Sequence, residues 1–138
     1  MKLLSVKHRL TDVRLMSILA PSMYRPTPER VAACAAAYQQ DPQAEAYACQ
    51  IDGVDVGLII FTVEGHEAVI QRIARDSAFR GQGIGRLMID QIMALFHLTA
   101  LEAETDDDAV GFYRQCGFSI TRRDRIEGNT RYLCRKVR

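Results

Sequence analysis

The hydrophobic and polar positions of the first 40 residues predict one strand and two helices. Residues 2–8 alternate loosely between apolar and polar side chains, as a half-buried strand does. Residues 11–19 predict a short helix, with Thr11 as its N-cap and Pro21 just beyond its end. Thr27 followed by Pro28 is a stronger helix start, and an alanine-rich run continues from there to residue 40.

The segment that follows predicts three consecutive strands. Residues 46–51 and 54–63 are joined by Asp52-Gly53, a dipeptide that suits the positive φ angles of a tight hairpin turn. Residues 57–61 are apolar at every position, so we expect both faces of that strand to be covered. A further turn leads into the third strand, over residues 68–74.

Two more helices are expected in the last third of the chain. The first covers residues 83–97, and its buried stripe consists of Ile84, Met88, Ile92 and Leu95. The second begins at the three aspartates of residues 106–108, which suit the positive end of a helix dipole, and ends at Gly117. Its buried face consists of Ala109, Phe112 and Cys116.

The remaining strands complete the predicted architecture. A short strand covers residues 99–103, and residues 118–125 and 131–137 form a last hairpin across a turn at residues 127–129. Helices and strands in this order predict an α+β fold around a mixed sheet.

Length, charge and composition narrow the class of protein. At 138 residues the chain is expected to form one domain over residues 1–138. Its 18 Lys and Arg against 17 Asp and Glu leave a net charge of +1, which argues against a nucleic-acid partner. No apolar stretch approaches the roughly 20 residues that span a bilayer, and the N-terminus lacks a signal-peptide pattern, so we expect a cytoplasmic protein without a membrane partner. The four cysteines form no CxxC pair, so we expect buried thiols and no metal site.

A glycine-rich segment between a strand and a helix is the strongest chemical signal. It reads Arg80-Gly81-Gln82-Gly83-Ile84-Gly85. Alternate glycines let backbone N–H groups converge, and the helix dipole and the arginine add positive charge, so the segment predicts a phosphate or pyrophosphate site. The dinucleotide fingerprint fails because Met88 stands where a glycine is needed, and the P-loop ending is missing. A glycine-rich turn without a ligand remains the alternative.

Two segments together resemble the GNAT (GCN5-related N-acetyltransferase) superfamily. Arg80, Gly83 and Gly85 match its R/Q-x-x-G-x-G/A pyrophosphate loop, and Phe112-Tyr113 with Gly117-Phe118 match its FY-x-x-x-GF segment. The order of predicted elements is also similar over nearly the whole chain. The resemblance implies a GNAT-like fold, with a mixed, mostly antiparallel seven-stranded sheet flanked by about four helices.

The same resemblance implies an acetyl-CoA-dependent N-acetyltransferase whose acceptor is a primary amine. The cofactor-binding residues that it implies are Ile73, Ala74, Arg75, Arg80, Gly81, Gln82, Gly83, Ile84, Gly85, Asp106 and Tyr113. Backbone groups of residues 73–75 would pair with the pantetheine arm, and amides of residues 80–85 would hold the pyrophosphate. The thioester would lie between the strands near residues 68–74 and 99–103, where an N–H of Ile73 or Ala74 faces its carbonyl oxygen. Asp106 replaces a frequent asparagine of the family, and Arg75 a frequent aliphatic residue.

Candidate catalytic residues are Tyr113 and Glu104. Tyr113 would deliver a proton to the departing sulfur, although its helical position also suits a core aromatic. A lysine-like acceptor must lose a proton, which costs roughly 4.6 kcal/mol at pH 7. His66, Glu67, Glu102 and Glu104 are candidate bases, and Glu104 is preferred because it ends a strand beside the expected gap. Val69 stands near the position of the base in histone-type members, which weakens a histone-like interpretation.

Several alternatives stay open at this point. The chain is interpreted as an enzyme whose amine acceptor attacks acetyl-CoA directly in a ternary complex; the alternative is a catalytically inactive acyl-CoA-binding or sensing module, and a third class is another phosphate-ligand protein. The acceptor is a small-molecule amine or a peptide or protein amine. The acidic residues between Glu102 and Asp108 favour a cationic amine, or serve only as helix-start charges. The C-terminal hairpin offers an edge for a homodimer.

Overall fold

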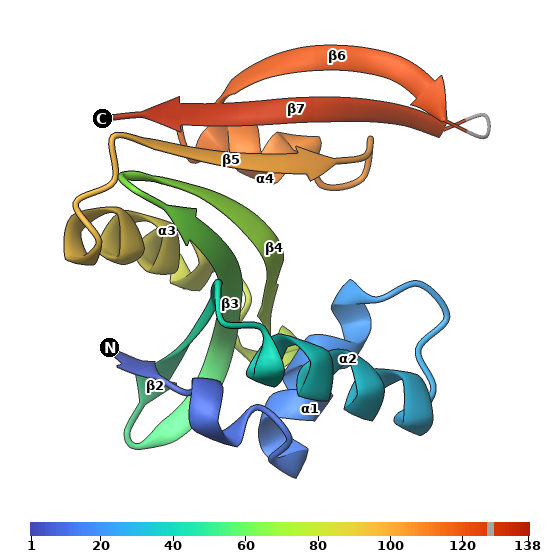
Figure 1. Cartoon of the computed structure of the whole chain (residues 1–138), viewed down its shortest axis with the longest axis vertical. Helices are drawn as coiled ribbons and strands as arrows, with labels where there is room; N and C mark the ends of the chain where they lie inside the picture. Colours follow the sequence, from blue (N-terminus) through green and yellow to red (C-terminus); the bar gives the residue numbers. More distant parts are fainter. Residues whose placement is uncertain (127–128) are drawn as a thin grey trace.

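The seven strands of the described chain form one sheet (Figure 1). The computed structural model describes residues 1–126 and 129–138, with side chains outside residues 124–129. The strands are β1 (Lys2–Ser5), β2 (Ala44–Ile51), β3 (Val54–Glu64), β4 (Glu67–Arg75), β5 (Ala100–Thr105), β6 (Ser119–Ile126) and β7 (Asn129–Val137). Their spatial order is β1-β2-β3-β4-β5-β7-β6, and every neighbouring pair is antiparallel except β4 and β5. The predicted mixed, mostly antiparallel seven-stranded sheet is therefore confirmed.

Helices cover both faces of this sheet. The four α-helices in the described chain are α1 (Val13–Leu19), α2 (Pro28–Gln40), α3 (Ile84–Leu95) and α4 (Val110–Gln115). Short 3-10 turns are η1 (Lys7–Arg9), η2 (Ala20–Ser22) and η3 (Ser77–Phe79). Buried side chains of α1 and α2 share one core cluster with β2 and β3, and those of α3 share the other with β3, β4 and β5. The α+β fold with four flanking helices follows the prediction.

Local sequence signals explain most of these elements. The Thr27 hydroxyl accepts a hydrogen bond from the Arg30 N–H at 3.2 Å, so it caps α2 as expected. Asp52 and Gly53 have φ angles of +51° and +78°, which confirms the tight turn between β2 and β3. Residues 57–61 are buried, because α1 and α2 pack on one face of β3 and α3 on the other.

Some predicted boundaries are wrong for identifiable reasons. The first strand ends at Ser5 rather than at residue 8, because η1 turns the chain there. The N-cap of α1 is Asp12 and not Thr11. Leu95 is 55% exposed, since Ile89 and Met93 share the buried face of α3 and leave Leu95 at its edge in the last turn. The turn expected at residues 127–129 includes residues 127 and 128, which lie outside the described part of the chain.

β4 and β5 separate after a short parallel contact. Residues 67–69 of β4 pair with residues 100–102 of β5, and the two strands then diverge (Figure 1). A register shift on the other side of β4, where Phe61 pairs with Ile70 and Ile60 with Arg72, leaves Gln71 as an extra residue. This bulge lies beside the opening. Within the described residues, the β5-facing edge of β4 beyond Val69 pairs with no strand.

A charged network fixes the N-terminal segment to this sheet. Asp55 is 7% exposed, and both of its carboxylate oxygens accept from the Arg9 guanidinium, at 2.8 and 3.0 Å. Gln50 donates to the same carboxylate at 2.9 Å. The hydrogen bonds from Arg9 outweigh burial and lower the pKa of Asp55.

Two further expectations from composition can be compared with the structure. Cys49, Cys116 and Cys134 are buried free thiols, as expected, whereas Cys34 is only partly buried. Within the described residues, none of the helices combines the length and the apolar character that crossing a bilayer requires.

Candidate active site

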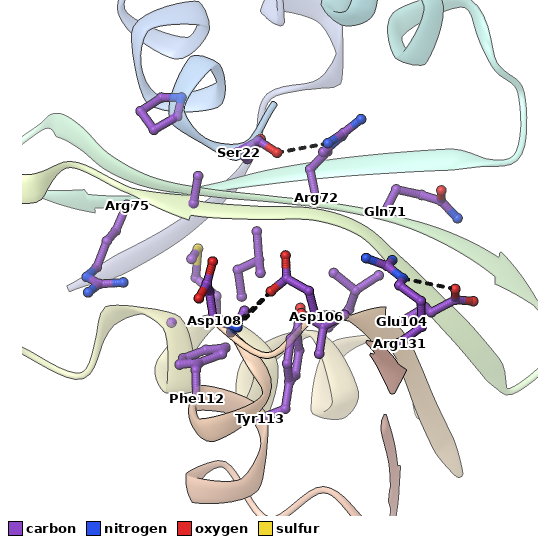
Figure 2. Close-up of a pocket in the computed structure, with 18 of the residues that line it drawn as sticks. Ser22, Gln71, Arg72, Arg75, Glu104, Asp106, Asp108, Phe112, Tyr113 and Arg131 are labelled. Atoms are coloured by element: carbon purple, nitrogen blue, oxygen red, sulfur yellow. Dashed lines mark hydrogen bonds and ion pairs between the residues drawn. The ribbon is translucent and has the colours of Figure 1, made fainter. Parts of the chain in front are cut away.

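A cleft of about 750 Å³ opens where β4 and β5 diverge (Figure 2). Segment 70–75 of β4 forms one wall, and the ends of β5, α3 and α4 form the other. Seven residues predicted as site residues line it together: Ile73, Ala74, Arg75, Gly85, Glu104, Asp106 and Tyr113. An adjoining hollow of about 430 Å³ shares residues 73–75 and adds Arg80.

The remaining predicted residues form the loop that leads into α3. Gly81 and Gly83 have φ angles of +75° and +70°, the left-handed region that glycine adopts without strain. Gly83 is the N-cap of α3, and the first helical bond runs from the Leu87 N–H to its carbonyl at 2.9 Å. Ile84 points its side chain into the core, so only its backbone is available to a ligand.

An array of free N–H groups begins α3. Among the described residues, no backbone or side-chain oxygen accepts a hydrogen bond from the backbone N–H groups of residues 80–86. The helix dipole adds positive potential at this end, and α3 has no acidic residue in its first turn. A Cβ built at Gly81 or Gly83 would meet no atom within 4 Å, so the space beside the loop is open. The arrangement fits a diphosphate.

Gly85 has a second role that the motif does not reveal. A Cβ at this position would lie 2.7 Å from both Cε1 and Cζ of Phe112. Carbon atoms normally approach to about 3.5–4.0 Å, so the absence of a side chain lets α3 and α4 pack closely. This contact sets one wall of the cleft.

Arg14 and Asp76 hold the other end of the loop. The Arg14 guanidinium donates to the Asp76 carboxylate at 2.7 Å and to the Asp55 carbonyl at 2.9 Å. The second oxygen of Asp76 accepts from the Ala78 N–H at 2.9 Å, which starts η3. The hydrogen bond from Ala78, followed by that from Arg14, lowers the pKa of Asp76. Sequence reasoning missed Arg14, because it lies 62 residues from its partner.

Tyr113 lies at the base of the cleft on α4. It is 6% exposed, and its ring packs edge to face against Phe112 and Phe118, each with a centroid separation of 5.2 Å. Its hydroxyl end points towards the opening between β4 and β5 (Figure 2). Burial raises the pKa of Tyr113 well above its ordinary value, so the hydroxyl stays protonated at neutral pH. The residue is thus both a core aromatic and a donor at the cleft.

The four candidate bases lie in different parts of the structure. Of these four described residues, Glu104 alone lines the main cleft, where Nη1 of Arg123 and Nε of Arg131 each approach its carboxylate at 3.4 Å. Glu102 and Glu67 line a different hollow, on the face formed by β3, β4 and β5. His66 Nδ1 lies 3.2 Å from a carbonyl oxygen, and His66 does not line the cleft.

Two of the acidic residues that precede α4 form hydrogen bonds with other groups of the chain. One carboxylate oxygen of Asp106 accepts from the N–H groups of Asp108 and Ala109, at 3.0 and 3.2 Å. Asp107 accepts from the Tyr132 hydroxyl at 2.6 Å. These bonds hold Asp106 in the turn that precedes α4 and join Asp107 to β7, whereas α4 itself has no side-chain cap. Within the described chain no group of three or more His, Cys, Asp and Glu side chains is placed to hold a metal ion.

Sequence reasoning also missed four other residues that line the cleft. Ser22, Tyr38, Arg72 and Arg131 all line it. They come from η2, α2, β4 and β7, so no motif joins them in the sequence. Their positions follow from the sheet topology alone.

Comparison with known proteins identifies the family of this chain. A family model described as an acetyltransferase (GNAT) domain matches residues 42–120, which is more than half of the chain. The chain belongs to the GNAT acetyltransferase family. The resemblance of the two sequence motifs to this family is thereby confirmed.

One relative of known name matches part of this GNAT domain in sequence. It is 34% identical over 73 residues to the peptidyl-lysine N-acetyltransferase YjaB of Salmonella typhimurium, a match covering 52% of this chain and 48% of that protein. The GNAT domain therefore spans about half the length of this relative.

Two solved structures show the same fold over nearly the full length. An aminoglycoside 6'-acetyltransferase type Ii matches with a TM-score of 0.81 and 16% identity, covering 99% of this chain and 97% of that one. A GNAT family acetyltransferase from Elizabethkingia anophelis, solved with acetyl-CoA bound, matches with a TM-score of 0.72 and 17% identity over the same shares.

Proposed function

We propose that this GNAT domain is an N-acetyltransferase that transfers an acetyl group from acetyl-CoA to a primary amine. The acceptor attacks the thioester directly in a ternary complex, without a covalent enzyme intermediate. The observation that carries this proposal is the array of free N–H groups on residues 80–86, beside the opening between β4 and β5. One site can thus hold a diphosphate next to a strand edge.

The residues present fit acetyl-CoA, which would supply the acetyl group as an activated thioester. The N–H groups of residues 80–85 and the side chains of Arg75 and Arg80 suit its diphosphate. Residues 73–75 pair with β3 on one side, and on the side that faces β5 their main-chain groups suit the amide groups of the pantetheine arm as an added strand. Asp106 lines the same cleft, but its bonds to the turn that precedes α4 favour a structural role.

Tyr113 is proposed to donate to the departing sulfur. Because burial raises its pKa, the hydroxyl is a hydrogen-bond donor rather than an anion at neutral pH. A thiol with a pKa of about 8.5 leaves readily, so such a donor contributes about 10²–10⁴ in rate and is not indispensable. An N–H of Ile73 or Ala74, on the unpaired edge of β4, is proposed to face the carbonyl oxygen of the thioester.

Glu104 is proposed to receive the proton of the amine, directly or through water. Its carboxylate lines the cleft, and both of its arginine contacts are long, so its oxygens have room for further partners. We also propose a cytoplasmic location, because all four thiols are free in the described chain.

Thiol release from acetyl-CoA, measured with a panel of amines, tests the proposal. The panel includes a lysine-containing peptide, because the Salmonella relative is named for that acceptor. Amine-dependent release of CoA, with the acetylated amine detected by mass spectrometry, is the expected result. CoA binding without turnover across the panel would favour a sensing module. Equal competition by ADP or NAD would indicate a different phosphate ligand.

A further inference from the structure

Arg72 lines the cleft, and within the described residues its guanidinium makes a single hydrogen bond. It lies on β4 directly before the segment proposed for the pantetheine arm, and it points towards Ser22 (Figure 2). Nη1 donates to the Ser22 carbonyl at 2.9 Å. Nε is buried and has no hydrogen-bond partner among the described residues. A buried donor on a charged group is costly to leave unpaired, so it calls for a partner that the chain does not supply.

The surrounding carboxylates do not supply this partner. No salt bridge in the described part of the chain involves Arg72. Glu104 is engaged by Arg123 and Arg131, and Asp106 accepts from two backbone N–H groups in the turn that precedes α4. Asp108 lies beside Phe112, on the α4 side of the cleft (Figure 2). The part of the cleft lined by Arg72 and Ser22 therefore offers positive charge to a ligand.

We propose that the acceptor is a primary amine with a carboxylate close to its amino group, and that Arg72 binds this carboxylate. The inference rests on the proposed acetyl transfer. A guanidinium presents parallel N–H donors that match the two oxygens of a carboxylate. A carboxylate there would accept from guanidinium N–H groups that have no partner in the described chain, and would orient the amine towards the β4 edge. Polycationic amines without an acidic group would instead meet a like charge at this wall.

Matched acceptors test the proposal in the unaltered protein. Alanine is compared with ethylamine, and phenylalanine with phenethylamine, so each pair differs by the carboxylate. We expect kcat/KM to be about tenfold or more higher for each amino acid, mainly through a lower KM. Capped peptides with lysine beside glutamate or glutamine show whether a peptide can supply the same carboxylate. Equal kcat/KM within all pairs would overturn the inference.

Variants of Arg72 assign the preference to its side chain. In R72Q we expect the ratio within each favoured pair to fall to about twofold or less, while KM for acetyl-CoA stays near that of the wild type. R72K keeps the positive charge but lacks the parallel N–H donors of a guanidinium, so we expect a kcat/KM ratio between those of the wild type and R72Q. The control is R30Q, because Arg30 is exposed on α2 and does not line the cleft.

The outcomes separate this inference from the proposed function. An unchanged ratio in R72Q would limit Arg72 to holding η2 against β4, and would overturn the proposal. If R72Q does not fold, the kcat/KM ratios of the matched acceptors, measured with the wild type and with R72K, test the proposal. Absence of thiol release with every amine would instead contradict the acetyltransferase function itself.

Discussion

Gly85→Ala tests the close approach of α3 and α4. The added Cβ would lie 2.7 Å from two ring carbons of Phe112. A normal carbon contact requires the ring or the helix to move by about 1 Å. Overpacking of this kind costs about 1–3 kcal/mol, and the better helix propensity of alanine offsets about 0.5–1 kcal/mol of it. We therefore expect a net loss of about 1–2 kcal/mol of unfolding free energy.

Urea unfolding followed by circular dichroism measures this loss, and G111A is the matched control. Gly111 lies on α4, and a Cβ there would meet no atom within 4 Å, so its replacement should be neutral or slightly stabilising. The variant F112L removes both contacting ring atoms, so G85A should cost little in that background. The reasoning is refuted if G85A matches G111A in stability, or if its cost persists beside Leu at position 112.

Three further outcomes follow from the site and the N-terminal network. Tyr113→Phe should lower kcat by about tenfold or more with little change in CoA affinity, and unchanged turnover would assign Tyr113 to packing alone. Glu104→Gln should lower kcat at neutral pH, whereas Glu102→Gln, outside the main cleft, should not; equal effects would remove Glu104 as the base. Asp55→Asn should lower unfolding free energy at pH 7 by about 2 kcal/mol, against no measurable loss for Asp12→Asn. Because the pKa of Asp55 is lowered in the folded protein, the ionised carboxylate contributes to unfolding free energy above pH about 4, and this contribution is lost below it. Plots of unfolding free energy against pH for the wild type and Asp55→Asn should therefore converge in acid.

Much of the fold could be predicted because its signals are local. The cap at Thr27, the turn at Asp52-Gly53 and the apolar run of β3 each depend on neighbouring residues, and each is confirmed. The loop of residues 80–85 could be predicted for the same reason, because Gly81 and Gly83 allow positive φ angles at their own positions.

The rest of the site depends on contacts between distant residues. Arg72 and Ser22 are separated by 50 positions and meet only because η2 packs against β4. The role of Gly85 in packing depends on where the ring of Phe112 lies, which no spacing rule gives. The exposed Leu95 shows the same limit, because its burial depends on which face of the last turn of α3 packs against the core.

Calorimetric titration of the folded protein with CoA, and in parallel with pantetheine, tests the central claim most directly. Pantetheine has the same arm but no diphosphate, so it cannot use the N–H groups that begin α3. One-to-one binding of CoA that weakens with salt, with pantetheine about 100-fold weaker or undetectable, is the predicted result. Equal affinities for the two compounds, or no heat of binding with CoA, would contradict a diphosphate site at this loop.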